Sequence, residues 1–261
     1  MIVTLTPNPS IDRTVSVPAL EHGEVNRASD SRIDPGGKGI NVARALTTNG
    51  TEALAVLPSG GPEGHLLQAL LRRSGTAYTA VPIAGTTRMN IAVIEPDGTT
   101  TKLNEPGPTL TDDEFDALLA TVDDHLDHDL RWIVGCGSLT PGMPEGIYAD
   151  LVRRGHVHGI KVAIDSSGAP FTAAVPAGPD LIKPNHEELE ELVDRPLRTL
   201  ADVGEAARTL VDGGIETVIV SLGRHGALLV NAHAVAHASA HVARPVSTVG
   251  AGDSLVAGYL H

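Results

Sequence analysis

Short apolar runs recur along this chain, and segments long enough to form helices separate them. The runs predict β-strands at residues 2–6, 52–57, 132–134, 161–164, 181–183 and 217–222. The intervening segments predict helices at residues 39–48, 64–74, 112–126, 145–154, 187–193 and 200–212. Alternation of this kind is typical of an α/β fold with a mostly parallel sheet, in which ligands bind beyond the carboxyl ends of the strands.

Two stretches, residues 11–33 and 86–104, have strand character without helical partners. Within the second, Pro96-Asp97-Gly98 separates two apolar runs, 89–95 and 99–103, which is a hairpin signal. We predict a small extra sheet that covers the mouth of the main domain as a lid and excludes water from a transfer reaction. The 261 residues suffice for a single domain around one core.

Composition narrows the function classes. Aromatic residues make up 2% of the chain and the formal net charge is −13, which disfavours nucleic-acid binding by stacking or by phosphate contacts. A small anionic substrate stays open because an acidic protein can hold a local basic site. The single cysteine, Cys136, excludes a disulfide within the chain and is predicted to be a buried small residue.

The sequence carries only weak signals for cellular location and for metal binding. The chain begins directly with a strand-like run and has no apolar stretch of membrane-spanning length, so we expect a cytoplasmic protein without a membrane partner. His233, His237 and His241 recur every four residues. Because acidic partners and a helical apolar stripe are missing around them, we do not predict a metal site there.

The segment around Gly250, Gly252 and Asp253 is the strongest chemical signal. Two glycines permit a tight turn, and the apolar run after Asp253 predicts a helix start whose free N–H groups form an anion site. The Asp253 carboxylate could then take a proton from a hydroxyl while the N–H groups hold a phosphoryl group. A glycine-rich turn with Asp253 as helix N-cap explains the same residues equally well.

A second glycine-rich element, Gly36-Gly37-Lys38-Gly39, precedes a predicted helix and places N–H groups beside a cation. This arrangement suits a phosphate or a sugar, although it is not a Walker A loop, and a turn with an incidental lysine is the alternative. Asp12 follows the first strand and either binds sugar hydroxyls or caps a turn. Arg88, at the start of a lid strand, either pairs with a substrate phosphate or is a solvated surface arginine.

Two further elements follow predicted strands near the other end of the sequence. Asn185 and Glu188 lie three apart at a helix start, so they either hold Mg²⁺ through water or form a capping box. The stretch from Ser221 to Gly226 is a strand followed by a glycine turn, which suits contact with a nucleotide.

Together these segments resemble the ribokinase-like (PfkB) sugar kinases along the whole chain, and most of all the 1-phosphofructokinase branch, next to the tagatose-6-phosphate kinases and the minor 6-phosphofructokinases. The motifs that carry the resemblance are Asn8-Pro9-Ser10-Ile11-Asp12, Gly36-Gly37-Lys38-Gly39-Ile40-Asn41, Thr87-Arg88-Met89-Asn90, Gly137-Ser138-Leu139, Asp165-Ser166-Ser167-Gly168, Lys183-Pro184-Asn185, Ser221-Leu222-Gly223 and Thr248-Val249-Gly250-Ala251-Gly252-Asp253-Ser254.

The resemblance implies a three-layer α/β/α sandwich with a small β-sheet lid, and ATP-dependent phosphorylation of a ketose phosphate. Fructose 1-phosphate is the expected substrate, with tagatose 6-phosphate or fructose 6-phosphate as alternatives. It implies that Asp253 is the catalytic base and that the backbone of Gly250, Ala251 and Gly252 forms an anion hole. The implied substrate positions are Asp12, Gly36, Gly37, Lys38, Asn41, Arg88, Asn90 and Ser138, with Lys38 and Arg88 on the substrate's phosphate. The implied ATP positions are Lys183, Asn185, Ser221, Gly223 and Gly226, and the implied Mg²⁺ ligands are Asn185 and Glu188.

The sequence departs from the family pattern in two places. Thr140 stands where these kinases usually have proline, and we expect little effect. The chain ends at His261, whereas family members continue for several tens of residues, so we expect a truncated kinase domain with bare apolar surface, or a non-catalytic binding remnant. Val15 and Val17 form one apolar set on the lid strands and Ile91 and Val93 a second, and such a face needs a cover. Lids of the resembled family often pair between subunits, so the resemblance implies a homodimer joined through the lid strands.

Overall fold

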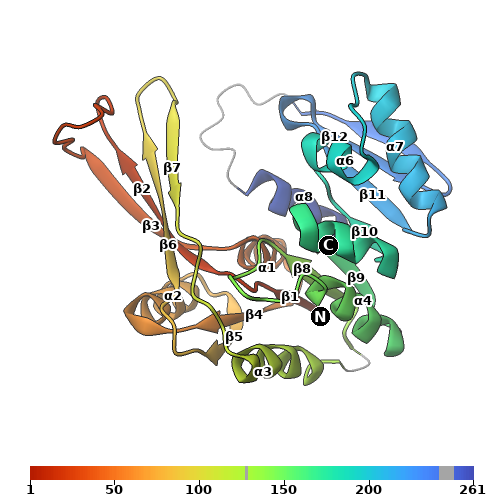
Figure 1. Ribbon diagram of the computed structural model, residues 1–261, viewed down its shortest axis with the longest axis horizontal. Helices are drawn as coiled ribbons and strands as arrows, with labels where there is room; N and C mark the ends of the chain where they lie inside the picture. Colours follow the sequence, from red (N-terminus) through yellow and green to blue (C-terminus); the bar gives the residue numbers. More distant parts are fainter. Residues whose placement is uncertain (127–128, 241–249) are drawn as a thin grey trace.

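A nine-stranded sheet forms the centre of the molecule, as the computed structural model shows for residues 1–126, 129–240 and 250–261 (Figure 1). Seven strands run parallel, and the last two join the edge as antiparallel strands. In spatial order the strands are β13 (Val235–Ala238), β12 (Ala227–Asn231), β11 (Thr217–Ser221), β10 (Leu181–Ile182), β9 (Lys161–Asp165), β8 (Trp132–Cys136), β1 (Ile2–Leu5), β4 (Ala53–Ser59) and β5 (Ala77–Pro82).

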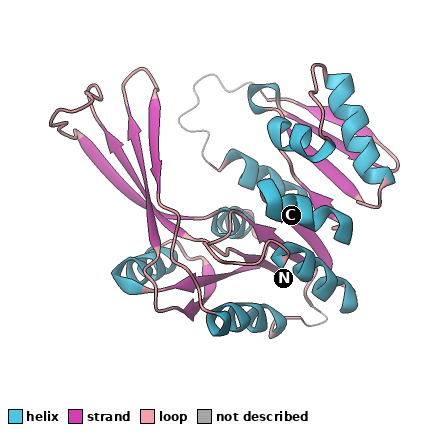
Figure 2. Ribbon diagram, in the orientation of Figure 1, coloured by secondary structure: helices cyan, strands magenta, loops and turns pink. Residues whose placement is uncertain are grey.

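Helices cover both faces of this sheet (Figure 2). They are α1 (Lys38–Thr48), α2 (Gly61–Arg73), α3 (Asp112–Asp123), α4 (Ile147–Val157), α5 (Gly168–Ala174), α6 (His186–Val193), α7 (Leu200–Asp212) and α8 (Ala251–Leu260). Successive strand residues point to opposite faces, so Ile133 packs with α3, α4, α6 and α7, while Val134 packs with α1, α2 and α8. Two apolar cores thus flank one sheet, and the expected three-layer sandwich is confirmed.

A separate four-stranded sheet projects from the main body at the left of Figure 1. Its order is β3 (Asp30–Gly36), β2 (Ser10–Ser16), β6 (Arg88–Ile94) and β7 (Thr100–Asn104). The hairpin predicted around Pro96-Asp97-Gly98 is confirmed, because β6 and β7 pair antiparallel and the Glu95 N–H donates to the Thr99 carbonyl at 3.0 Å. We call this four-stranded sheet the lid sheet.

The structure also shows where the sequence pattern misled. β5, β12, β13 and α5 were not predicted: β13 is exposed along its length, β5 buries only Val81 deeply, and α5 has just seven residues. The helix expected over residues 112–126 ends at Asp123, and the one expected from residue 64 begins at Gly61 with a proline in its first turn. Among the described residues, no helix is long and apolar enough to cross a membrane.

Candidate active site

The first turn of α8 places Asp253 against α1. The Asn41 side-chain amide donates a 2.8 Å hydrogen bond to Oδ2 of Asp253, whose residue is only 6% exposed. Burial raises the pKa of Asp253 and the nearby Asp165 charge adds to this, while the Asn41 hydrogen bond, Lys38 and Lys183 oppose it. The net upward shift makes this carboxylate a stronger base than an exposed aspartate.

The start of α8 is an anion-binding geometry. Gly250 is the N-cap, with a left-handed φ of 80°, and the first helical hydrogen bond runs from the Ser254 N–H to the Gly250 carbonyl at 2.8 Å. In such a turn the N–H groups of Ala251, Gly252 and Asp253 have no acceptor within the helix. The alternative in which Asp253 is the N-cap is wrong, because Gly250 holds that position. Residues 247–249 of the motif lie outside the described residues.

Lys38 and Lys183 converge on one buried carboxylate. Lys38, the first residue of α1, donates from Nζ to Oδ1 of Asp165 at 2.8 Å, and Lys183 Nζ lies 3.4 Å from the same oxygen. Burial alone would lower the pKa of Lys38, but the carboxylates of Asp165, Glu188 and Asp253 outweigh it and the pKa rises. Lys38 therefore stays protonated.

Gly252 joins this group to α8. A Cβ at Gly252 would lie 3.3 Å from Lys183 Nζ, so the ammonium group packs closely against the first turn of α8 and would have to shift slightly for a larger residue there. Lys38 and Asn41 are three residues apart on α1 and thus share a face. These polar residues come from α1, α8 and the carboxyl ends of β9 and β10. We call Lys38, Asn41, Asp165, Lys183 and Asp253 the transfer cluster.

A second polar group lies on the lid sheet. Asp12 Oδ1 accepts hydrogen bonds from the Ser10 hydroxyl at 2.7 Å and from the Asn90 amide at 3.1 Å. A Cβ at Gly36, on the neighbouring strand, would meet Asp12 Cγ at 2.3 Å, so the carboxylate lies directly over that glycine. Ser10 on β2 and Asn90 on β6 thus fix the orientation of the Asp12 carboxylate.

Arg88 is built into the base of the lid sheet. Its guanidinium donates to the carbonyls of Glu105 at 2.9 Å and Asn8 at 3.0 Å, while Nε has no hydrogen-bond partner among the described residues. The side chain is half-buried, so the alternative of a solvated surface arginine is wrong. The charges of Asp12 and Glu105 act on Arg88, whereas those of Asp165, Glu188 and Asp253 act on Lys38. The two cations thus have different charged neighbours.

The predicted nucleotide residues gather beyond β10 and β11. Asn185 and Glu188 form a capping box: the Glu188 N–H donates to Asn185 Oδ1 and the Asn185 N–H donates to Glu188 Oε2, both at 2.7 Å. Asn185 also bridges to Ser221, and the Leu222 N–H closes the following turn on the Gly226 carbonyl. The 3₁₀ turn Gly223–His225 lies inside that loop.

No group of three metal-binding side chains is present within the described residues. His237 lies on β13 and its ring nitrogen contacts the His225 carbonyl, while His241 lies outside the described residues. Burial raises the pKa of Glu188, against the opposing charges of Lys38 and Lys183. Whether Asn185 and Glu188 also hold Mg²⁺ therefore stays a prediction.

Ser138 is exposed just after β8, and a Cβ on its neighbour Gly137 would lie 3.9 Å from Lys38 Cβ. Gly37 is the N-cap of α1, directly before Lys38. Cys136 is fully buried, as predicted. Sequence reasoning quoted Asp165 within a motif but gave it no role. The signal that could have found it is an acid at the last position of a buried strand, at the carboxyl edge of the sheet.

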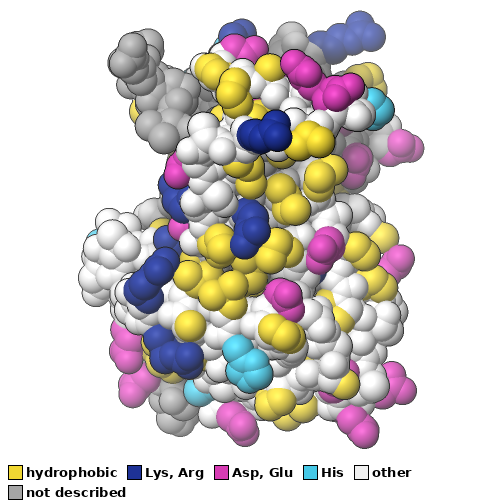
Figure 3. Space-filling view, turned by 90° about the vertical axis from the view of Figure 1, so that its left-hand side faces the viewer, with side chains coloured by type: hydrophobic (Ala, Val, Ile, Leu, Met, Phe, Trp, Pro, Cys, Tyr) yellow, Lys and Arg dark blue, Asp and Glu magenta, His cyan; other side chains and the backbone are white. Residues whose placement is uncertain are grey.

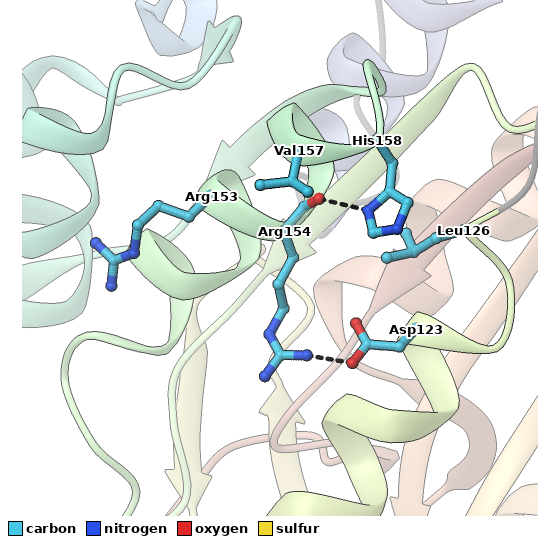
Figure 4. Close-up of a pocket in the computed structure, with 6 residues that line it drawn as sticks. All are labelled: Asp123, Leu126, Arg153, Arg154, Val157 and His158. Carbon is cyan, nitrogen blue, oxygen red and sulfur yellow. Dashed lines mark hydrogen bonds and ion pairs between the residues drawn. The ribbon is translucent and has the colours of Figure 1, made fainter.

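A shallow pocket between α3 and α4 lies outside both polar groups (Figure 4). Arg154 pairs with Asp123, His158 contacts the Arg154 carbonyl, and Arg153 points away from the other labelled side chains. Because its cationic groups do not converge, this pocket is not a candidate for anion binding.

The family model described as "pfkB family carbohydrate kinase" matches residues 6–261. The chain belongs to the pfkB carbohydrate kinase family. As a member it is a sugar kinase that transfers a phosphoryl group to an alcohol, and the resemblance inferred from the motifs is confirmed. The names of its relatives support a sugar kinase of the phosphofructokinase type.

Three pfkB relatives illustrate what the chain is similar to. A 1-phosphofructokinase from Rhodobacter capsulatus is 37% identical over 261 residues, covering 100% of this chain and 83% of the relative. An ATP-dependent 6-phosphofructokinase isozyme 2 from Mycobacterium tuberculosis is 38% identical, covering 98% and 76%. The solved phosphofructokinase-2 from Escherichia coli in complex with substrates and products is 36% identical with a TM-score of 0.94, covering 98% and 84%.

Proposed function

We propose that the protein transfers the terminal phosphoryl group of ATP to fructose 1-phosphate and forms fructose 1,6-bisphosphate. The observation that carries this proposal is a buried carboxylate, Asp253, at a helix N-terminus and near enough to Lys38 and Lys183 for their charges to act on it, in a chain whose similar relatives include 1-phosphofructokinases. We place the reaction in the cytoplasm.

The transfer cluster supplies the groups that the reaction needs. Asp253 accepts the proton of the attacking sugar hydroxyl as the O–P bond forms, and the terminal phosphoryl group leaves ADP. The first-turn N–H groups of α8, with Lys38 and Lys183, neutralise charge on the transferred group. In-line transfer depends mainly on such positioning and electrostatic stabilisation.

The lid sheet supplies the groups for the rest of the sugar. Asp12, oriented by Ser10 and Asn90, accepts hydrogen bonds from sugar hydroxyls. The phosphate already on a ketose phosphate lies at the opposite end of the carbon chain from the hydroxyl that attacks. We therefore assign that phosphate to Arg88, which has different charged neighbours from Asp253, and Lys38 to the transferred group.

The nucleotide residues fit ATP and Mg²⁺. The capping box uses one carboxylate oxygen of Glu188, and its other oxygen remains for a hydrated cation, which suits Mg²⁺ because this ion keeps most of its waters. Asn185 and Glu188 would hold the ion beside Lys183, and Ser221, Gly223 and Gly226 would line the nucleotide. When bound, Mg²⁺ supplies charge neutralisation at the phosphates.

A homodimer through the lid sheet completes the proposal. Val15 lies beside Val93, and Ile91 beside Leu103, whose residue is 59% exposed. Figure 3 looks onto the side of the molecule that carries the lid sheet and shows hydrophobic side chains among Lys and Arg. Apolar side chains on a four-stranded sheet with open edges favour pairing with a second copy.

The substrate is tested by a coupled assay of ADP release with ATP, Mg²⁺ and one ketose phosphate at a time. We expect the highest kcat/KM with fructose 1-phosphate, and lower values with fructose 6-phosphate and tagatose 6-phosphate. A higher kcat/KM with either of the latter two would make that sugar phosphate the assigned substrate in place of fructose 1-phosphate. Binding of an unreactive ATP analogue without turnover of any sugar would instead favour a non-catalytic binding protein.

Arg88→Ala should mainly weaken binding of the phosphosugar. A hydrogen bond from a charged group contributes about 1.5–3 kcal/mol, so KM for fructose 1-phosphate should rise about 10–100-fold while KM for ATP changes little. Steady-state kinetics with both substrates varied checks this. Arg32→Ala, which removes an exposed arginine paired with Asp34 on the same sheet, is the matched control. Equal weakening of both substrates would contradict the assignment.

A further inference from the structure

Asp165 is the most deeply buried charged group of the transfer cluster, and the proposed function assigns it no step of its own. It ends β9 and is 1% exposed. Removing a carboxylate from water is unfavourable unless opposite charges and hydrogen bonds compensate it. Asp165 must therefore be explained by the groups that it holds.

The two lysines that Asp165 holds come from different sides of the site. Lys38 begins α1, directly after the lid strand β3, whereas Lys183 follows β10 and lies beside the start of α8. Both ammonium groups use Oδ1, at 2.8 and 3.4 Å. Oδ2 is buried and has no hydrogen-bond partner among the described residues. Oδ1 is therefore the atom through which Asp165 contacts both lysines.

We propose that Asp165 is a positioning residue that holds Lys38 and Lys183 at the point of phosphoryl transfer. This inference rests on the proposed function. Lysine side chains are long and flexible, so an anchor that fixes them before the substrates bind pre-organises the charge that the transition state needs. The same anchor draws both ammonium groups to Asp165, while the hydrogen bond to Asp253 comes from the neutral amide of Asn41. The base stays free to accept a proton.

A double-mutant cycle separates positioning from a general structural role. Asp165→Asn keeps the shape and removes the charge. We expect kcat with fructose 1-phosphate to fall about 10–100-fold, the scale of a small misplacement of catalytic groups. In a Lys38→Met, Lys183→Met background the same change should lower kcat by less than about threefold, because the groups through which Asp165 acts are gone.

Glu216→Gln is the matched control. Glu216 pairs with Lys161 at the opposite end of β9 and both side chains are exposed, so this variant also removes a carboxylate from a lysine pair. It should leave kcat and both KM values unchanged. Circular dichroism and thermal melting report whether each variant is folded. If Asp165→Asn does not fold, Asp165→Asn with Lys183→Met leaves no unpaired buried lysine at this position, and it is compared with Lys183→Met alone.

Two results would overturn the inference. One is a folded Asp165→Asn variant with wild-type kcat, and the other is an equal loss of kcat in both backgrounds. If the wild-type chain phosphorylates none of the three ketose phosphates, the proposed function fails instead. Asp165 is then tested by binding of an unreactive ATP analogue. We expect its Kd to rise about five- to tenfold in Asp165→Asn, at the lower end of usual coupling between sites, and an unchanged Kd would refute the anchor.

Discussion

Asp253→Asn should lower kcat about 10²–10⁴-fold, because it removes the group that we propose accepts the proton of the attacking hydroxyl. Asparagine keeps the size of the side chain, so KM for fructose 1-phosphate and ATP should change little. Steady-state kinetics with fructose 1-phosphate measures both. Asp116→Asn, on the exposed face of α3, is the matched control and should behave as wild type. A variant that retains near-normal kcat would show that Asp253 is not the base.

The pH profile gives an independent check on the same residue. Burial holds the pKa of Asp253 above that of an ordinary aspartate. Activity requires the deprotonated carboxylate, so it should be lost as the pH falls through this raised pKa, and the acidic limb of kcat/KM should lie above the usual aspartate range. The residual activity of Asp253→Asn should lack that limb.

Lys38→Met should lower kcat about 10²–10³-fold, the usual scale for removing one group that stabilises charge in a transition state. Methionine keeps most of the length and removes the charge, while Lys183 still pairs with Asp165. Because we assign Lys38 to the transferred phosphoryl group, KM for fructose 1-phosphate should change much less than in Arg88→Ala.

Lys161→Met is the control for this variant, since it also removes a lysine from an ion pair with a carboxylate, but at the far end of β9. It should leave kcat unchanged. A rise in KM for fructose 1-phosphate with normal kcat in Lys38→Met would mean that Lys38 and Arg88 together hold the phosphate already on the substrate, as the sequence resemblance implies.

Local pattern was sufficient for much of the fold. The strands in the middle of the large sheet are continuous apolar runs because both faces are buried. Several of them are followed by a helix with clear boundary signals, such as the capping box at Asn185 and Glu188 after β10. The pattern failed at the edges, where β13 is exposed and β5 half-buried, because an edge strand needs little apolar sequence. β12 was also missed, because it begins directly after the turn that contains Gly223 and Gly226, and that stretch was interpreted only as a turn.

The candidate site was predictable only in part, for a related reason. The glycine-rich motifs around Lys38 and Asp253 were enough to predict each of them as a candidate site residue on its own. The contact between Asn41 and Asp253 joins positions 212 residues apart, and that between Lys38 and Asp165 joins positions 127 apart. Pairings over such separations depend on strand order, which one sequence does not reveal. Local spacing also left two functions open for Asn185 and Glu188, and the capping box uses only some of their atoms.

The division of polar groups between two sheets has an evolutionary consequence. Asp12, Asn90 and Arg88 lie on the lid sheet, whereas the transfer cluster lies at the edge of the large sheet and on α1 and α8. If these groups have the proposed roles, substitutions on β2 or β6 would alter which sugar is accepted without rebuilding the groups that move the phosphoryl group. Such a layout would let the products of duplicated genes diverge in sugar specificity while they keep the same phosphoryl-transfer chemistry.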